Sequence, residues 1–145
     1  MGKSSLSYPA TITPDEGEYL VTFRDLPNVF SSGESEQEAI FNAQEALDLV
    51  LEEMHDENIE IAGPSGAKKN EVLVPVSPDI AVPILLRKLR AFHNYTYADV
   101  AKIMGVSYQS YQQIEKGKNI TLKTLKKAAM ALGATVEVGF LTNTP

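Results

Sequence analysis

The chain has 145 residues, of which 43% are hydrophobic and 22% charged, so it reads as a globular protein of one domain or two small ones. It contains no cysteine, which excludes disulfides, thiolate zinc sites and a cysteine nucleophile. No apolar run approaches the roughly 20 residues of a membrane span, and Met1–Ser5 lacks the apolar centre of a signal peptide. We therefore expect a cytoplasmic protein that does not bind membranes.

The net charge of −6 is unevenly distributed along the chain. Residues 1–75 carry 15 Asp and Glu against 4 Lys and Arg, a balance of −11, whereas residues 76–145 carry 4 against 9, a balance of +5. Such a split indicates two modules with different partners. The basic half is suited to nucleic acid, and the acidic half is suited to a basic protein.

Alternating apolar residues predict a β-hairpin at the start of the chain. The alternation covers residues 8–13, a turn sequence follows at 14–17, and residues 18–24 resume the alternation. A weaker third strand is predicted at 29–32.

A helix and a further strand complete the first half. Ser35 and Glu38 form a capping-box sequence, so we expect a helix from there to about Glu57. Residues 71–76 alternate again and predict a strand, which Pro75 places at a sheet edge or at the end of the strand. The first half, residues 1–76, is thus an α+β layer with one helix on a small sheet.

The second half, residues 77–145, is predicted to be mainly helical. Ser77 and Pro78 have the pattern of a helix start, and Pro83 either kinks that helix or marks its true beginning. Residues 134–140 predict a strand, which could pair with its copy in a second subunit or add to the fold of its own chain. The four predicted helices cover residues 77–92, 96–104, 107–115 and 121–132.

Residues 97–116 match the requirements of a helix-turn-helix. Ala101 is small enough for two helices that cross steeply, and four residues later Gly105 supplies the positive φ of the tight turn. Thr96 and Ser107 can cap the second and third helices. The positions expected to be buried are Val100, Met104, Val106, Tyr111 and Ile114.

The outer face of the third helix is the candidate site. Gln109 and Gln113 are i, i+4 neighbours, and glutamine can bond bidentately to adenine in the major groove. An ordinary helical hairpin with a polar face is the alternative. The residues expected to face the groove are Tyr108, Gln109, Gln112, Gln113 and Lys116, and those expected to hold phosphates are Ser110, Lys116, Lys118 and Lys123.

The sequence Val106-Ser107 and the run Ile114–Lys118, followed by another amphipathic helix, closely resemble the Cro/C1-type helix-turn-helix family over about residues 82–133. The resemblance implies a five-helix DNA-binding domain that acts as a dimer on palindromic DNA. The Ile or Val usual in the family is replaced by Tyr111, whose hydroxyl needs a partner or the surface.

Four short motifs in the first half resemble the HicB antitoxin family over about residues 7–76. The resemblance implies a truncated RNase H-like fold and neutralisation of a HicA-type toxin, an mRNA-cleaving ribonuclease with a double-stranded-RNA-binding-like fold. It also implies repression of the protein's own operon. The motifs are Tyr8-Pro9-Ala10, Tyr19-Leu20-Val21-Thr22-Phe23, Asp25-Leu26-Pro27 and Gly33-Glu34-Ser35, the last followed by Glu38-Ala39.

Two other functions are alternatives to that of an antitoxin and repressor. One is a stand-alone transcriptional regulator whose first domain senses a ligand or a protein. The other is a metal-dependent nuclease, which needs carboxylates converging on the sheet. The first strand has none in its middle, and Asp25 more simply shapes the chain, so we expect no catalysis, no cofactor and no metal. We expect a solvated His55, a helix-capping His93 and a linker at Gly63–Gly66.

Overall fold

The computed structural model describes residues 2–118 and 120–142, which divide into two compact units, Met1–Leu85 and Leu86–Pro145. The sequence places the division at residues 76 and 77, but the two units meet within a helix instead. The first turns of that helix bring Ala81 and Ile84 into the hydrophobic core of the first unit, which explains the shift. No helix in these described ranges is both long and apolar enough to cross a bilayer.

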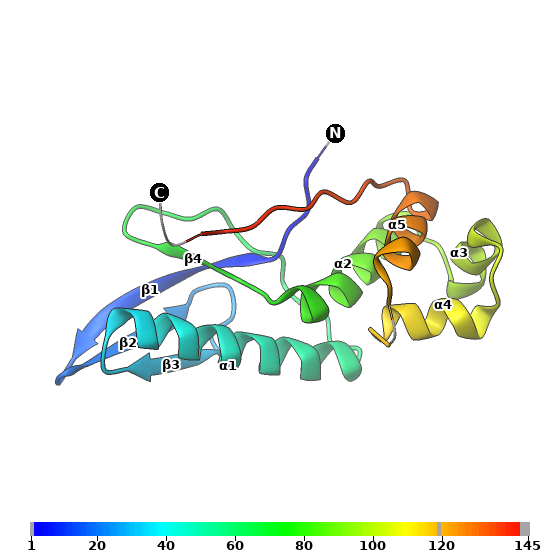
Figure 1. Ribbon diagram of the computed structural model, residues 1–145. Coiled ribbons are helices and arrows are strands. Elements are labelled where there is room, and N and C mark those ends of the chain that lie inside the picture. Colours follow the sequence, from blue (N-terminus) through cyan, green and yellow to red (C-terminus); the bar gives the residue numbers. More distant parts are fainter. Residues whose placement is uncertain (1, 119, 143–145) are drawn as a thin grey trace. The chain divides into compact units, whose positions relative to one another are not determined.

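The first unit is a four-stranded antiparallel sheet with one long helix (Figure 1). The strand order is β3-β2-β1-β4, so β3 and β4 are the edges. All four predicted strands and the predicted helix are confirmed, and the hairpin turn is tighter than expected, with positive φ at Glu16 and Gly17. The elements are β1 (Ser7–Asp15), β2 (Glu18–Phe23), β3 (Phe30–Gly33), α1 (Glu36–Asp56) and β4 (Val72–Pro75).

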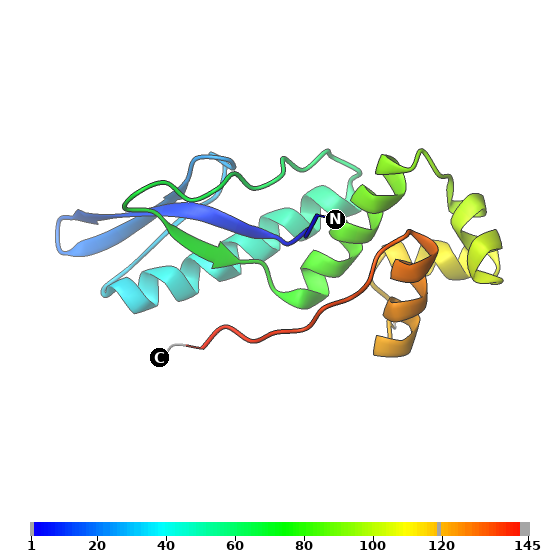
Figure 2. The ribbon, with the colours of Figure 1, turned by 90° about the horizontal axis from the view of Figure 1, so that it is seen from above.

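The core of this unit lies between the sheet and α1, which crosses one face of the sheet (Figure 1 and Figure 2). Successive strand residues point to opposite faces, so Tyr8 and Val21 are buried while Thr11 and Thr22 are exposed. Every fourth residue of α1 from Ala39 onward is buried against the sheet. Full burial of one leucine of this row, such as Leu47, contributes about 1.5–3 kcal/mol. The buried row is Ala39, Ala43, Leu47, Leu51 and His55.

Two local features start α1 at the edge of the sheet. Ser35 caps the helix as predicted, accepting a hydrogen bond from the Glu38 amide at 3.1 Å. Gly33, the last residue of β3, lies so close to the first turn that a Cβ there would stand 2.5 Å from the backbone nitrogen of Ala39. The sequence at this point therefore needs glycine for space rather than for its φ angle.

The second unit is helical. Four helices follow β4 among the described residues, and the first of them begins before the boundary at residue 86. They are α2 (Pro78–Phe92), α3 (Tyr97–Met104), α4 (Tyr108–Glu115) and α5 (Leu122–Ala131). Because α2 begins at Pro78, Pro83 lies inside the helix and does not mark its start. Ser77 donates its hydroxyl proton to Asp48 of α1, which ties the start of α2 to the first unit's helix.

Two predictions for this half are wrong. The fifth helix implied by the Cro/C1 resemblance is not found within residues 86–118 and 120–142, and residues 134–140 form no strand. The alternation of Val136, Val138 and Phe140 indicates extended backbone, but a strand also needs a hydrogen-bonded neighbour. In the part of the chain that the structure describes, no strand pairs with this segment, and Phe140 is 90% exposed.

Candidate nucleic-acid interface

The turn between α3 and α4 has the geometry that its sequence predicts. Thr96 caps α3 in a reciprocal box with Asp99, with distances of 3.1 Å from the Asp99 amide to Thr96 Oγ1 and 2.8 Å from the Thr96 amide to the Asp99 carboxylate. Gly105 ends α3 in the left-handed conformation, at φ 73° and ψ 31°. Ser107 then caps α4 by accepting from the Ser110 amide at 3.1 Å. Helix, turn and helix are therefore each determined locally.

The inner face of α4 holds the helix against the rest of the unit. Tyr111 is fully buried and Ile114 is 7% exposed, and beneath them Val100 and Ala101 of α3 are buried as predicted. Val106, expected in the core, is instead 39% exposed. The residue follows the Gly105 turn directly, where the chain leaves the surface of α3 before α4 begins.

A buried ion pair, which the sequence reasoning missed, fastens α4 to α2. Glu115 is 1% exposed and receives two hydrogen bonds from Arg90, at 2.6 and 3.0 Å, while Arg87 lies 3.8 Å away. Arg90 also donates to the Tyr95 carbonyl and stacks on the Tyr97 ring, 4.3 Å from its centroid.

The same contacts shift two pKa values. The hydrogen bond to Glu115 raises the pKa of the Arg90 guanidinium, and burial together with the Glu115 carboxylate raises the pKa of Tyr111. The Arg90 guanidinium is therefore held in its charged form, and the Tyr111 hydroxyl in its neutral form. The sequence offered one signal for the buried ion pair, because Glu115 stands four residues after Tyr111 on the inner face of α4.

The outer face of α4 carries the candidate DNA-binding residues. Gln109 and Gln113 are exposed, Tyr108 is 46% exposed, and Gln112 is half-buried. The Ser110 hydroxyl accepts a hydrogen bond from the Ser107 hydroxyl at 2.9 Å and is itself exposed. The remaining candidates, Lys116, Lys118 and Lys123, are exposed at and beyond the carboxyl end of α4.

A shallow hollow lies beside this face, between α4 and α5. Gln113, Ser110 and Lys118 line it together with Lys127, a residue of α5 that the sequence reasoning did not single out. The apolar residues that line it are Met104, Val106 and Ile114. Lys127 thus adds a cation to the same side of the unit as Lys118.

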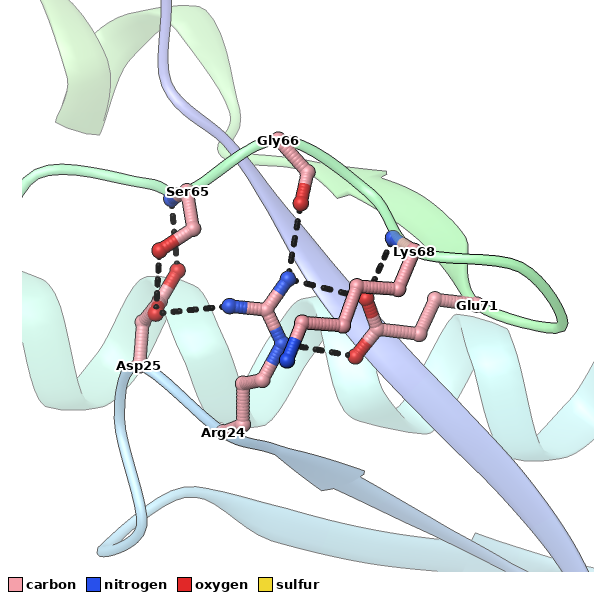
Figure 3. A network of polar contacts seen from close by, with 6 residues as sticks. All are labelled: Arg24, Asp25, Ser65, Gly66, Lys68 and Glu71. Carbon is pink, nitrogen blue, oxygen red and sulfur yellow. Dashed lines mark hydrogen bonds and ion pairs between the residues drawn. The ribbon is translucent and has the colours of Figure 1, made fainter.

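A second polar cluster lies in the first unit, where it ties residues 65–71 to the end of β2 (Figure 3). Asp25 accepts hydrogen bonds from the Ser65 amide at 2.7 Å and the Ser65 hydroxyl at 2.8 Å. Arg24 forms a two-bond pair with Glu71, each bond 2.9 Å long, and donates to the Gly66 carbonyl at 2.7 Å. Asp25 thus shapes the chain, as expected.

This cluster holds its carboxylates in the charged form. The Ser65 amide, more than any other group, holds the pKa of Asp25 below its usual range, and the bond from Arg24 does the same for Glu71. Because Ser65 and Gly66 are hydrogen-bonded to Asp25 and Arg24 at the end of β2, residues 63–66 are tethered to the sheet and are not a simple linker. Within residues 2–118 and 120–142, no group of three or more His, Asp or Glu is arranged to hold a metal ion.

The two histidines differ from their expected roles. His55, expected to be solvated, is 5% exposed because it continues the buried row of α1 four residues after Leu51. His93 lies 2.8 Å through its Nε2 from the Leu132 carbonyl at the end of α5. It therefore caps a helix other than its own.

The comparisons with known proteins assign both units. The family described as HicB-like antitoxin of bacterial toxin–antitoxin systems matches residues 7–85, and a helix-turn-helix family matches residues 86–138. The chain belongs to the HicB-like antitoxin family. Its second unit is a helix-turn-helix DNA-binding domain of the kind found in transcription regulators.

Relatives of known name agree with this assignment. Antitoxin HicB 2 of Photorhabdus laumondii is 30% identical over 92% of this chain and 96% of its own length. Antitoxin HicB of Escherichia coli K12 is 28% identical over 88% of this chain and 94% of its own length. An uncharacterized HTH-type transcriptional regulator of Methanocaldococcus jannaschii is 44% identical over 39% of this chain and 86% of its own length.

Proposed function

We propose that this HicB-like chain neutralises a HicA-type, mRNA-cleaving toxin by binding it through the first unit, and represses its own operon by binding operator DNA through α4. The observation that carries the DNA half is the placement of Gln109 and Gln113 side by side on the exposed face of a helix whose inner face is buried. A helix held in this way can enter the major groove without rearrangement, and its glutamines can read adenines.

The surrounding residues supply the contacts that set the register. Ser110, Lys116, Lys118 and Lys123 are exposed near α4 and would hold phosphates, while Tyr108 and Gln112 would lie beside the bases. A single helix of this size reads only a few base pairs. We therefore expect two copies of the chain on DNA, with recognition helices about 34 Å apart on a palindromic operator.

The toxin half is supported by family membership and by charge. Relatives that match nearly the whole chain are named Antitoxin HicB. A ribonuclease presents basic surface to its RNA, and the balance of −11 in residues 1–75 would steer the antitoxin onto that surface. Bound there, the antitoxin would exclude RNA without any chemistry of its own.

One experiment tests both halves with the full-length chain. The product of the neighbouring gene, which we expect to be a small basic protein, is co-expressed with a tag, and the complex is assayed for RNA cleavage and for binding to the DNA upstream of the operon. We expect co-purification, loss of ribonuclease activity and a sequence-specific DNA complex. Operator binding without a protein partner would instead support the stand-alone regulator.

A further inference from the structure

Helix α1 carries two continuous rows of residues with opposite character. The inner row, described above, is buried against the sheet. The outer row, here called the α1 stripe, has spacings of three and four residues and therefore follows one side of the helix for its whole length. Its members are Glu38, Phe41, Glu45, Leu49, Glu52 and Asp56, all of them exposed.

The α1 stripe contains two large apolar side chains that the fold leaves in solvent. Phe41 is 60% exposed and Leu49 is 68% exposed, although the same helix buries smaller residues on its other side. Placed two turns apart, they alternate along the stripe with Glu45 and Glu52. Apolar anchors surrounded by polar groups are the usual anatomy of a protein–protein interface.

Glu36 and Glu38 suit the first turn of α1, but the carboxylates of the α1 stripe beyond that turn are not explained by the stability of the helix. Residues Glu36–Asp56 contain seven carboxylates and no Lys or Arg. Glu52 and Asp56 are like-charged i, i+4 neighbours near the carboxyl end of the helix, where the macrodipole favours cations. The repulsion between these carboxylates and their unfavourable interaction with the macrodipole both oppose folding of the free chain. A cationic surface bound to the stripe would offset both.

We propose that the α1 stripe is the surface on which a basic protein partner docks, with Phe41 and Leu49 as apolar anchors and the carboxylates pairing with Lys or Arg around them. This inference rests on the proposed function, and it identifies the docked surface as the RNA-binding face of the toxin.

The open face of the sheet is the competing surface, and its chemistry fits a basic partner less well. Phe30 is 66% exposed and Leu73 is 53% exposed on that side. Thr22 lies opposite Phe30 and Thr11 opposite Thr22, both of them neutral, while Glu71, two residues before Leu73, is already paired with Arg24. Charge complementarity therefore selects α1 over the sheet.

The test measures the affinity of the full-length chain for the purified small protein encoded beside its gene, at 0.1 M and 0.5 M salt. For Phe41→Ala combined with Leu49→Ala we expect a loss of about 30-fold or more at both salts. For Glu45→Lys combined with Glu52→Lys we expect a loss of about 10-fold at 0.1 M salt that shrinks at 0.5 M. Phe30→Ala, an exposed aromatic truncation on the opposite face, is the matched control and should change the affinity less than about twofold.

The other outcomes distinguish failure of the α1 stripe from failure of the proposed toxin binding. If the unaltered chain does not bind the small protein, the proposed toxin binding fails and the inference fails with it. If the unaltered chain binds and both stripe variants bind equally well, the function stands and the α1 stripe is wrong. If only Phe30→Ala lowers the affinity for the small protein, the interface lies on the open face of the sheet and not on α1.

Two controls guard against other causes of a loss. Unchanged operator binding and an unchanged circular dichroism melt would show that the variants are folded. Light scattering of the free chain detects self-association. If the stripe variants reduce the oligomeric mass and leave toxin binding intact, a second copy covers the stripe, which contradicts the proposal.

Discussion

Gln109 and Gln113 lie one turn apart on the exposed face of α4, and their amides can each satisfy an adenine edge. We predict that Gln109→Ala or Gln113→Ala costs about 1–3 kcal/mol of operator affinity and relaxes the base preference at one position per half-site. Fluorescence anisotropy with the operator and single-base variants measures both effects. Gln37→Ala, the same change at an exposed site on α1, is the control. If both α4 variants keep their full affinity and selectivity, α4 does not bind in the major groove.

Lys118 has a different expected role because it lies beyond the end of α4, beside the hollow that Lys127 also lines. We predict that Lys118→Ala weakens binding to all DNA sequences alike and lowers the slope of log K against log salt by about one. Titrations with operator and random DNA at four salt concentrations would show this. A loss at one base pair only would indicate base reading instead.

Glycine at position 33 matters at the scale of elements, because it lets the end of β3 approach the first turn of α1. A Cβ would lie 2.5 Å from the Ala39 nitrogen, so Gly33→Ala forces the strand or the helix to move. We expect a loss of about 2 kcal/mol in the free energy of unfolding of the first unit, measured by urea titration. Gly63→Ala is the control, since nothing lies within 4 Å of its added Cβ. Equal stability of the two variants would show that β3 and α1 are less tightly apposed.

The loop at residues 65–71 depends on carboxylates that must stay ionised. The pKa of Asp25 is lowered by Ser65 and that of Glu71 by Arg24, so the folded state favours their charged forms. Both therefore stabilise the fold at neutral pH, and their contribution is lost as pH falls through and below about 4. We predict that the stability of the first unit falls with acidification over this range and that Asp25→Asn flattens the fall. Thermal melts between pH 3 and 7 test this, and parallel curves for the two proteins would exclude a role for Asp25.

The boundary between the two units is a property of the whole molecule. Ala81 and Ile84 lie beyond the boundary predicted at residue 76, yet they belong to the first unit's core, and Ile84 is 2% exposed. We predict that a fragment of residues 1–85 is more stable than a fragment of residues 1–76 by at least about 2 kcal/mol, the value of burying one such side chain. Urea unfolding of the two fragments measures the difference. If the two fragments have similar urea midpoints, residues 77–85 are not needed for the first unit and its boundary lies at residue 76.

Local signals in the sequence were sufficient for most of the elements. The caps at Ser35, Thr96 and Ser107 and the left-handed turn at Gly105 each depend on residues three or four positions apart, so they were predicted and are confirmed. The contacts that were missed, Arg90 with Glu115 and Asp25 with Ser65, join residues 25 and 40 positions apart. Nothing in a single sequence records which distant charges will meet.

The sequence by itself determined the order of strands and helices along the chain, the exposed polar face of α4 and the acidic character of the first half, because periodicity, capping and charge depend on neighbouring residues. Only the tertiary structure decided that His55 is buried, that Val106 is exposed, that residues 134–140 lack a partner strand and that α2 is shared at the boundary. Each of these depends on what packs against a segment from elsewhere in the chain. Burial is a property of such long-range contacts and not of the segment alone.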